Sequence, residues 1–174
     1  MVRIVIFGNS GSGKSSLAKA LSTFYQAEHL DLDIIAWKAD QPGIRANFED
    51  SKRDLLRFIG ESDSWVVEGC YSHLLREAAL HCTEMIFLNP GVETCVENCR
   101  ARPWESHKYP SAEAQDANLQ MLIEWVREYE TREDEFSLQE HRKLFDSHEG
   151  RKVEYASNEK ALERVDLSEP EGRI

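Results

Sequence analysis

The fold is decided by the stretch Gly8-Asn9-Ser10-Gly11-Ser12-Gly13-Lys14-Ser15. This stretch matches the phosphate-binding pattern G-x-x-x-x-G-K-[ST] at every fixed position. The apolar run at residues 2–7 predicts a buried strand before it, and residues 15–25 carry apolar side chains at helical spacing after it. Since the motif requires a strand, a glycine-rich turn and a helix in this order, we interpret residues 8–15 as a phosphate loop.

The residue types of this phosphate loop suit an anionic ligand. Glycine adopts backbone angles that other residues avoid, so backbone N–H groups can curl around a phosphate at the positive end of the following helix. Lys14 can reach the β- and γ-phosphates, and the Ser15 hydroxyl can bind Mg²⁺. We expect phosphate contacts from eight residues: Gly8, Ser10, Gly11, Ser12, Gly13, Lys14, Ser15 and Ser16.

Composition limits the possible classes of protein. The chain has 174 residues, of which 41% are hydrophobic, so we expect one domain spanning residues 1–174. A net charge of −11 disfavours general nucleic-acid binding, and no apolar run approaches the length of a membrane span. The first strand begins at Val2, which argues against a signal peptide, and the four cysteines form no C-x-x-C pair. These features predict a cytoplasmic protein with reduced thiols; the oligomeric state stays open.

Apolar patterns of strand and helix alternate along the chain. This alternation predicts an α/β fold in which helices cover a parallel sheet. We expect strands at 2–7, 28–32, 64–69, 84–88 and 152–155, and helices at 15–25, 48–59, 92–101, 112–136, 137–147 and 160–165. Residues 102–111 contain two prolines and no periodicity, and they predict a loop.

Acidic residues stand at the ends of the second and third predicted strands. Ligands of open α/β sheets bind at the carboxyl ends of the strands. Asp31 and Asp33 fit two tasks there: one orients Mg²⁺ or its water, and the other accepts the proton of an attacking hydroxyl. Glu68, followed by Gly69, is a second candidate ligand of Mg²⁺, with the amide of Asn89 as a weaker rival. The alternative interpretation of these acids is a polar turn or cap at a strand end.

Basic residues gather in one loop of this acidic chain. Arg100 and Arg102 precede Pro103, and arginines that close over a γ-phosphate stabilise the charge of a transition state. We therefore expect a lid over about residues 100–111, the alternative being a surface loop. Arg53 and Arg57 follow the second strand, and they either meet an anionic acceptor or face solvent.

These motifs occur in an order that resembles the adenylate-kinase-like small-molecule kinases, which include adenylate, shikimate and gluconate kinases. The resemblance is closest to the branch labelled topology-modulation proteins. It implies the three-layer P-loop NTPase fold, with a five-stranded parallel sheet of order 2-3-1-4-5. It also implies ATP and Mg²⁺, a substrate-binding region at about residues 34–60, and an Asp33 that faces the acceptor. We expect Asp31 and Gly69 to belong to the same acceptor site. The chain has His73 where adenylate kinases have an arginine, and only Gly69 where shikimate kinases have three glycines.

The sequence therefore predicts an ATP- and Mg²⁺-dependent phosphotransferase. Its acceptor would be a small hydroxyl- or phosphate-bearing metabolite such as a nucleotide, a nucleoside or a sugar acid. In this hypothesis Lys14, Asp33, Arg100 and Arg102 are catalytic, and Ser15 and Glu68 hold the metal. The alternative is a nucleotide-binding regulatory ATPase that acts through a protein partner. The acids near residue 33 and the arginine loop favour the kinase, because a switch needs no acceptor site.

Overall fold

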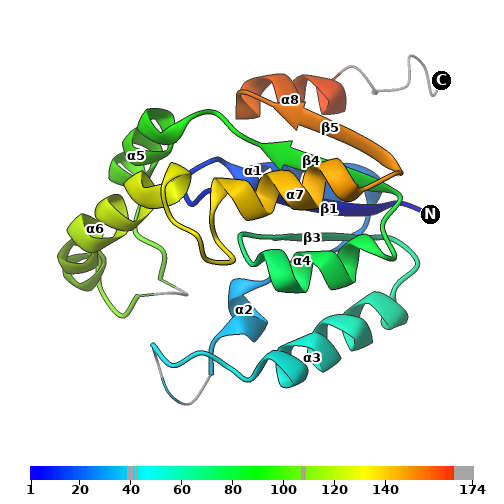
Figure 1. Cartoon of the computed structure of the whole chain (residues 1–174), viewed down its shortest axis with the longest axis horizontal. Helices are drawn as coiled ribbons and strands as arrows, with labels where there is room; N and C mark the ends of the chain where they lie inside the picture. Colours follow the sequence, from blue (N-terminus) through cyan, green and yellow to red (C-terminus); the bar gives the residue numbers. More distant parts are fainter. Residues whose placement is uncertain (39–40, 42, 107–108, 167–174) are drawn as a thin grey trace.

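Five parallel strands form one sheet in the order β2-β3-β1-β4-β5, which confirms the predicted topology (Figure 1). The computed structural model describes residues 1–38, 41, 43–106 and 109–166. The strands are β1 (Arg3–Gly8), β2 (Glu28–Asp31), β3 (Trp65–Gly69), β4 (Glu84–Leu88) and β5 (Arg151–Tyr155). The three central strands are buried at nearly every position, because helices cover both faces of the sheet.

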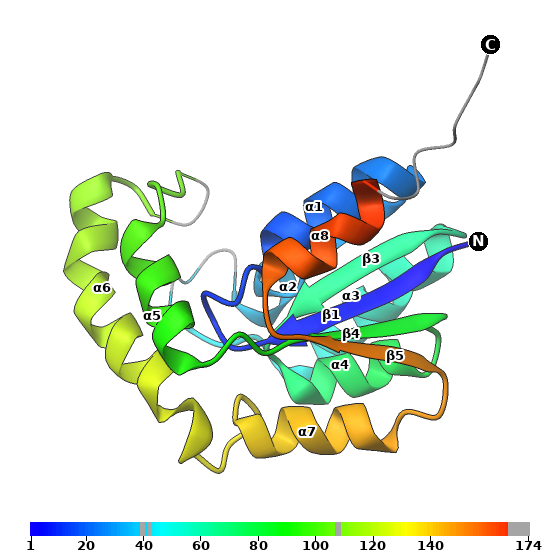
Figure 2. The same ribbon diagram turned by 90° about the horizontal axis from the view of Figure 1, so that it is seen from above.

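Helices lie on both faces of the sheet and beyond one of its ends (Figure 2). They are α1 (Lys14–Tyr25), α2 (Asp33–Ala36), α3 (Phe48–Glu61), α4 (Ser72–Ala79), α5 (Val92–Ala101), α6 (Ala112–Arg127), α7 (Leu138–Ser147) and α8 (Asn158–Asp166). Ile4 and Ile6 of β1 pack with α1 and α8, whereas Val5 and Phe7 pack on the other face with α3, α4 and α7. This alternation follows from the twofold period of a strand.

The pair α5 and α6 lies beyond the end of the sheet at which the phosphate loop sits (Figures 1 and 2). The two helices pack through a small core of their own, whose members include Cys95, Cys99 and Val126. They are joined by residues 102–111, which contain no helix or strand in their described part, as the sequence predicts. Residues 107 and 108 of the predicted lid, residues 39, 40 and 42 of the predicted substrate region, and the tail from residue 167 lie outside the described residues.

The predicted helix over 112–136 is wrong at its carboxyl end. Helix α6 ends at Arg127, where the Glu128 N–H turns to the carbonyls of Glu124 and Val126, and a 3-10 turn (Glu128–Glu130) follows. The Asp134 carboxylate then accepts the N–H of Phe136, a local bond that competes with a helical ladder. Apolar residues at 129 and 136 continue the helical spacing by coincidence, since Phe136 packs on Tyr71 and Trp125 instead.

Two helices were not expected from the sequence, namely α2 and α4. Both are short. Helix α2 follows β2 and begins at Asp33, and α4 begins at Ser72, shortly after β3 ends at Gly69. Among the described residues, no helix combines the length and apolar character needed to cross a bilayer.

Candidate active site

The phosphate loop joins β1 to α1 and is packed too tightly for side chains at its glycines. Gly8 and Gly11 have φ angles of 151° and 80°, in the region that glycine favours. A Cβ on Gly8 would lie 2.1 Å from the Leu88 carbonyl oxygen, and one on Gly11 would lie 2.3 Å from that of Cys95. The loop is therefore held against β4 and α5, which is why the sequence requires glycine at these positions.

The side chain of Lys14 bonds across the phosphate loop. Its ammonium group donates a hydrogen bond across 2.8 Å to the carbonyl of Asn9, and only 9% of the residue is exposed. Helix α1 begins at this lysine, and Gly13 before it provides no side-chain cap. The first N–H groups of a helix are unpaired within the helix, so this end of α1 presents donors and positive potential to an anion.

Glu68 lies at the carboxyl end of β3 and is 2% exposed. Its strand neighbour in the sheet is Asp31 at the end of β2. Burial and the charge of Asp31 raise the pKa of Glu68 to about 7, while Lys14 and a hydrogen bond with Ser15 act in the opposite direction. The carboxylate of Glu68 therefore lies close enough to Asp31, Lys14 and Ser15 to interact with all three.

One oxygen of Glu68 has no hydrogen-bond partner among the described residues. The nearest basic atom is Nε2 of His29, which lies 3.9 Å away and also has no hydrogen bond within the described chain. Burial lowers the pKa of His29, so this imidazole is a poor counter-ion. A buried carboxylate oxygen without a donor is a favourable ligand for a cation.

The donor set at this position fits Mg²⁺. The hydroxyl of Ser15 and the carboxylate of Glu68 are oxygen ligands, which Mg²⁺ prefers. No group of three or more His, Cys, Asp or Glu residues in the described part of the chain could hold a metal by itself. A magnesium ion here would therefore complete its shell with phosphate oxygens and water, as Mg²⁺ does at nucleotide sites.

Asp33 begins α2, beside the acids of β2 and β3. Its N–H donates to the Asp31 carboxylate across 2.9 Å, which fixes the backbone at the start of the helix. The hydroxyl of Tyr71 donates to Oδ1 of Asp33 across 2.5 Å, and the indole N–H of Trp37 donates to that hydroxyl across 2.8 Å. Sequence reasoning missed Tyr71, because nothing local relates it to an aspartate 38 positions earlier.

Arg45 makes contacts with aromatic rings that the sequence did not reveal. Its guanidinium lies 4.7 Å from the ring centre of Tyr71 and 5.3 Å from that of Trp37, and it pairs with Glu135 across 3.1 Å. The same guanidinium lies 5.4 Å from the ring centre of Phe136. This contact joins the segment after α2 to the segment before α7, on the side of the site where Asp33 lies.

Arg53 and Arg57 are not brought to these acids by any contact in the described structure. Their side chains are 68% and 65% exposed, and they pair with Asp50 and Asp54 of the same helix. Gly69 stands at the end of β3, where a Cβ would lie 2.9 Å from the Leu32 side chain. Its small size is therefore required by packing between β3 and the start of α2.

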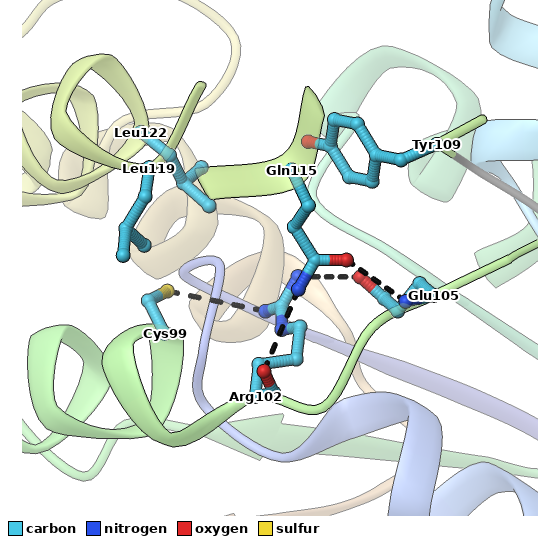
Figure 3. Close-up of a pocket in the computed structure, with 7 residues that line it drawn as sticks. All are labelled: Cys99, Arg102, Glu105, Tyr109, Gln115, Leu119 and Leu122. Atoms are coloured by element: carbon cyan, nitrogen blue, oxygen red, sulfur yellow. Dashed lines mark hydrogen bonds and ion pairs between the residues drawn. The ribbon is translucent and has the colours of Figure 1, made fainter. Parts of the chain in front are cut away.

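The arginines of the predicted lid have different surroundings. Arg102 points into a small pocket between α5 and α6, where it pairs with Glu105 across 3.2 Å and approaches the Cys99 sulfur at 3.9 Å (Figure 3). The remaining lining of that pocket is Tyr109, Gln115, Leu119 and Leu122. Arg100 is exposed on the last turn of α5.

The base of this helix pair is hydrogen-bonded to the phosphate loop at two points. The Asn98 amide of α5 donates to the Gly11 carbonyl across 2.8 Å. The Asn9 amide donates to the Val126 carbonyl of α6 across 3.0 Å, in a buried position. The phosphate loop is thus hydrogen-bonded to the two helices that flank the predicted lid, a relation that residues 87 and 117 positions apart do not reveal in sequence.

Comparison with known proteins identifies the fold. No protein-family model matches the chain, and no curated protein matches it. A shikimate kinase from Bacteroides thetaiotaomicron is similar in structure, with a TM-score of 0.55 at 15% identity over 95% of each chain. A shikimate kinase from Acinetobacter baumannii gives 0.52 at 16% identity, over 94% of this chain and 90% of that one. A gluconokinase from Sinorhizobium meliloti gives 0.50 at 22% identity, over 95% of this chain and 92% of that one.

At these identities the likeness concerns the fold and not the acceptor. The parallel sheet of order β2-β3-β1-β4-β5, with helices on both faces, is consistent with this likeness. The chain therefore has the α/β fold of the small-molecule P-loop kinases.

Proposed function

We propose that this chain is an ATP- and Mg²⁺-dependent phosphotransferase that acts on a small hydroxyl- or phosphate-bearing metabolite. The observation that carries the proposal is the meeting of Lys14, Ser15, Glu68 and Asp31 at the carboxyl ends of β2 and β3, with Asp33 bonded beside them. In this proposal one domain, residues 1–174, carries the whole site. The acceptor binds near residues 34–60, and residues 100–111 form the lid.

The residues of the chain divide the work between them. The phosphate loop binds the nucleotide phosphates through its N–H groups, and Lys14 exchanges its bond with Asn9 for the β- and γ-phosphates. Ser15 and Glu68 hold the metal, which when bound neutralises phosphate charge. Arg100 and Arg102 approach the transferring group when the lid closes, and closure excludes water. To reach the transferring group, Arg102 must leave its ion pair with Glu105 and bind phosphate instead.

Asp33 takes the proton in this scheme. The acceptor oxygen forms a bond to the γ-phosphorus as the bond between that phosphorus and the β,γ-bridging oxygen breaks, which releases ADP. The acceptor's hydroxyl proton moves to the Asp33 carboxylate. We expect the Asp33→Asn variant to bind ATP nearly as well as the wild type and to lose turnover. Wild-type turnover by this variant would overturn the role of Asp33.

A thermal-shift screen tests the function as a whole. The protein is melted with ATP·Mg²⁺ or a non-hydrolysable analogue, alone and with nucleosides, nucleotides, sugar acids and shikimate, and each hit is assayed for ADP release. A ligand that binds the native state raises the melting temperature by mass action. Stabilisation by nucleotide plus one acceptor supports the kinase. Stabilisation by nucleotide alone across a broad panel favours a regulatory ATPase with a protein partner, and no response to any nucleotide contradicts both.

A further inference from the structure

Tyr71 stands between Asp33 and Trp37 in a chain of hydrogen bonds whose direction can be assigned. An indole N–H is a donor only, so Trp37 must donate to the Tyr71 oxygen across 2.8 Å. The single proton of the phenol then points to Oδ1 of Asp33, 2.5 Å away. Trp37 therefore fixes the direction in which the Tyr71 hydroxyl donates.

The Tyr71 ring is held rigidly in this place. Tyr71 is only 3% exposed and packs edge to face on Phe136, with a centroid distance of 5.3 Å. The Arg45 guanidinium covers the ring at 4.7 Å. Burial and the neighbouring charge of Asp33 raise the pKa of Tyr71, so the phenol stays a neutral donor at neutral and mildly alkaline pH.

We propose that Tyr71, oriented by Trp37, is a positioning residue that fixes the Asp33 carboxylate for proton transfer. The proposal rests on the role of Asp33 in the proposed function. A hydrogen bond to the charged form of a carboxylate stabilises that form and restricts its rotation. Trp37 is 39% exposed at the start of the predicted substrate region, so its contact with an acceptor would be transmitted to Asp33 through one hydroxyl.

A purely structural role makes a different prediction for one substitution. Tyr71→Phe keeps the ring, its packing on Phe136 and its contact with Arg45, and removes only the hydroxyl. If the ring alone matters, this variant behaves as the wild type. We call the chain of hydrogen bonds from Trp37 through Tyr71 to Asp33 the relay. If the relay positions Asp33, Tyr71→Phe has a lower kcat and a changed environment of the Trp37 indole, and it still binds nucleotide.

The relay is tested first without any acceptor, by NMR of the ¹⁵N-labelled tryptophan indoles with Trp37 assigned through Trp37→Phe. We expect the Trp37 N–H resonance to move in Tyr71→Phe and also in Asp33→Asn, because both change the chain of bonds that starts at this indole. Tyr25→Phe is the control: it removes a hydroxyl at the far end of α1, and the resonance should stay in place. An unmoved Trp37 resonance in Tyr71→Phe overturns the relay.

The catalytic consequence is measured with ATP·Mg²⁺ and water as the acceptor, or with the acceptor that the screen identifies. We expect Tyr71→Phe to lower kcat about tenfold, the size of one charged hydrogen bond, with KM for ATP unchanged and an altered pH–rate profile. If Tyr71→Phe has the kcat and the pH–rate profile of the wild type while Asp33→Asn is impaired, the positioning role of Tyr71 is overturned and the role of Asp33 stands. Absence of any nucleotide stabilisation in the wild type instead contradicts the proposed function and leaves the NMR result to decide the relay.

Discussion

The Lys14 ammonium donates its hydrogen bond to the carbonyl of Asn9, five residues back in the same phosphate loop. The lysine thereby holds the loop in a curled form, and a buried cation is satisfied by a backbone oxygen. Asn9 uses its side chain at the same time to bind the Val126 carbonyl of α6. One residue therefore connects the lysine that would bind phosphate to the helix that follows the predicted lid.

The first prediction concerns this lysine. We expect Lys14→Ala to remove the stabilisation by ATP·Mg²⁺ and all turnover, because the variant loses the only side-chain cation of the phosphate loop. The far-UV circular dichroism should be unchanged, since the sheet does not depend on the lysine. Lys19→Ala, an exposed position on the same helix, is the matched control and should respond to nucleotide as the wild type does. An equal thermal shift in Lys14→Ala and the control would contradict the site.

The second prediction concerns the buried acid. Since the pKa of Glu68 is raised to about 7 from a normal value of 4.5, its ionised form destabilises the native state as the pH rises through this range. We expect Glu68→Gln to stabilise the nucleotide-free protein, by up to about 3 kcal/mol at pH 8 and by less toward pH 5. The same variant should lose the part of the ATP-induced shift that depends on Mg²⁺.

Thermal denaturation at both pH values, with and without ATP·Mg²⁺, measures these two effects. The control is Glu84→Gln, which also changes a buried carboxylate but at the opposite end of the sheet, where Glu84 pairs with Arg151 across 3.3 Å. This control should be less stable than the wild type and keep its Mg²⁺ response. Unchanged Mg²⁺ dependence in Glu68→Gln would remove Glu68 from the metal site.

The sheet could be predicted from the sequence, because each strand is marked by a local run of apolar residues. Strand β4 and helix α5 have the bounds that their apolar patterns predict, and the phosphate loop fixes the order of the elements around it. The contacts around Asp33 could not be predicted in this way, because the Tyr71–Asp33 and Arg45–Glu135 hydrogen bonds join residues 38 and 90 positions apart. The orientation of Arg53 and Arg57 could have been inferred from Leu55 and Ile59, which occupy the buried face of α3.

The third prediction concerns the hydrogen bond between helix α5, which leads into the predicted lid, and the phosphate loop. The amide of Asn98 orients the peptide after Gly11 from a partly exposed position, so Asn98→Ala should not harm the core. We expect this variant to bind ATP·Mg²⁺ about fivefold more weakly, which corresponds to about 1 kcal/mol for one hydrogen bond. Isothermal titration measures the change, with the exposed neighbour Glu97→Ala as the control. Equal affinity in the two variants would show that the phosphate loop keeps its shape without α5.

The fourth prediction concerns a histidine that is buried far from the phosphate loop in sequence. His141 is fully buried; its two ring nitrogens bond to the Tyr129 hydroxyl across 2.7 Å and to the Cys70 carbonyl across 2.8 Å. A carbonyl only accepts, so Nε2 carries the proton and Nδ1 accepts from the phenol. This chain of hydrogen bonds joins the 3-10 turn after α6 to the segment that precedes Tyr71, and it uses the neutral imidazole.

Burial lowers the pKa of His141 to about 4, so its effect on stability has a definite sign. Below pH 6.5 the unfolded state takes up a proton that the folded state refuses until about pH 4, and the free energy of unfolding falls as the pH falls through this window. We expect the stability difference between the wild type and His141→Gln to decrease by up to about 3 kcal/mol from pH 7 to pH 4. Glu68 acts in the opposite direction, but it is present in both proteins and cancels in the difference. Urea denaturation across the pH series measures this difference, with the exposed His81→Gln as the control, and a difference that stays constant with pH would contradict the neutral, buried imidazole.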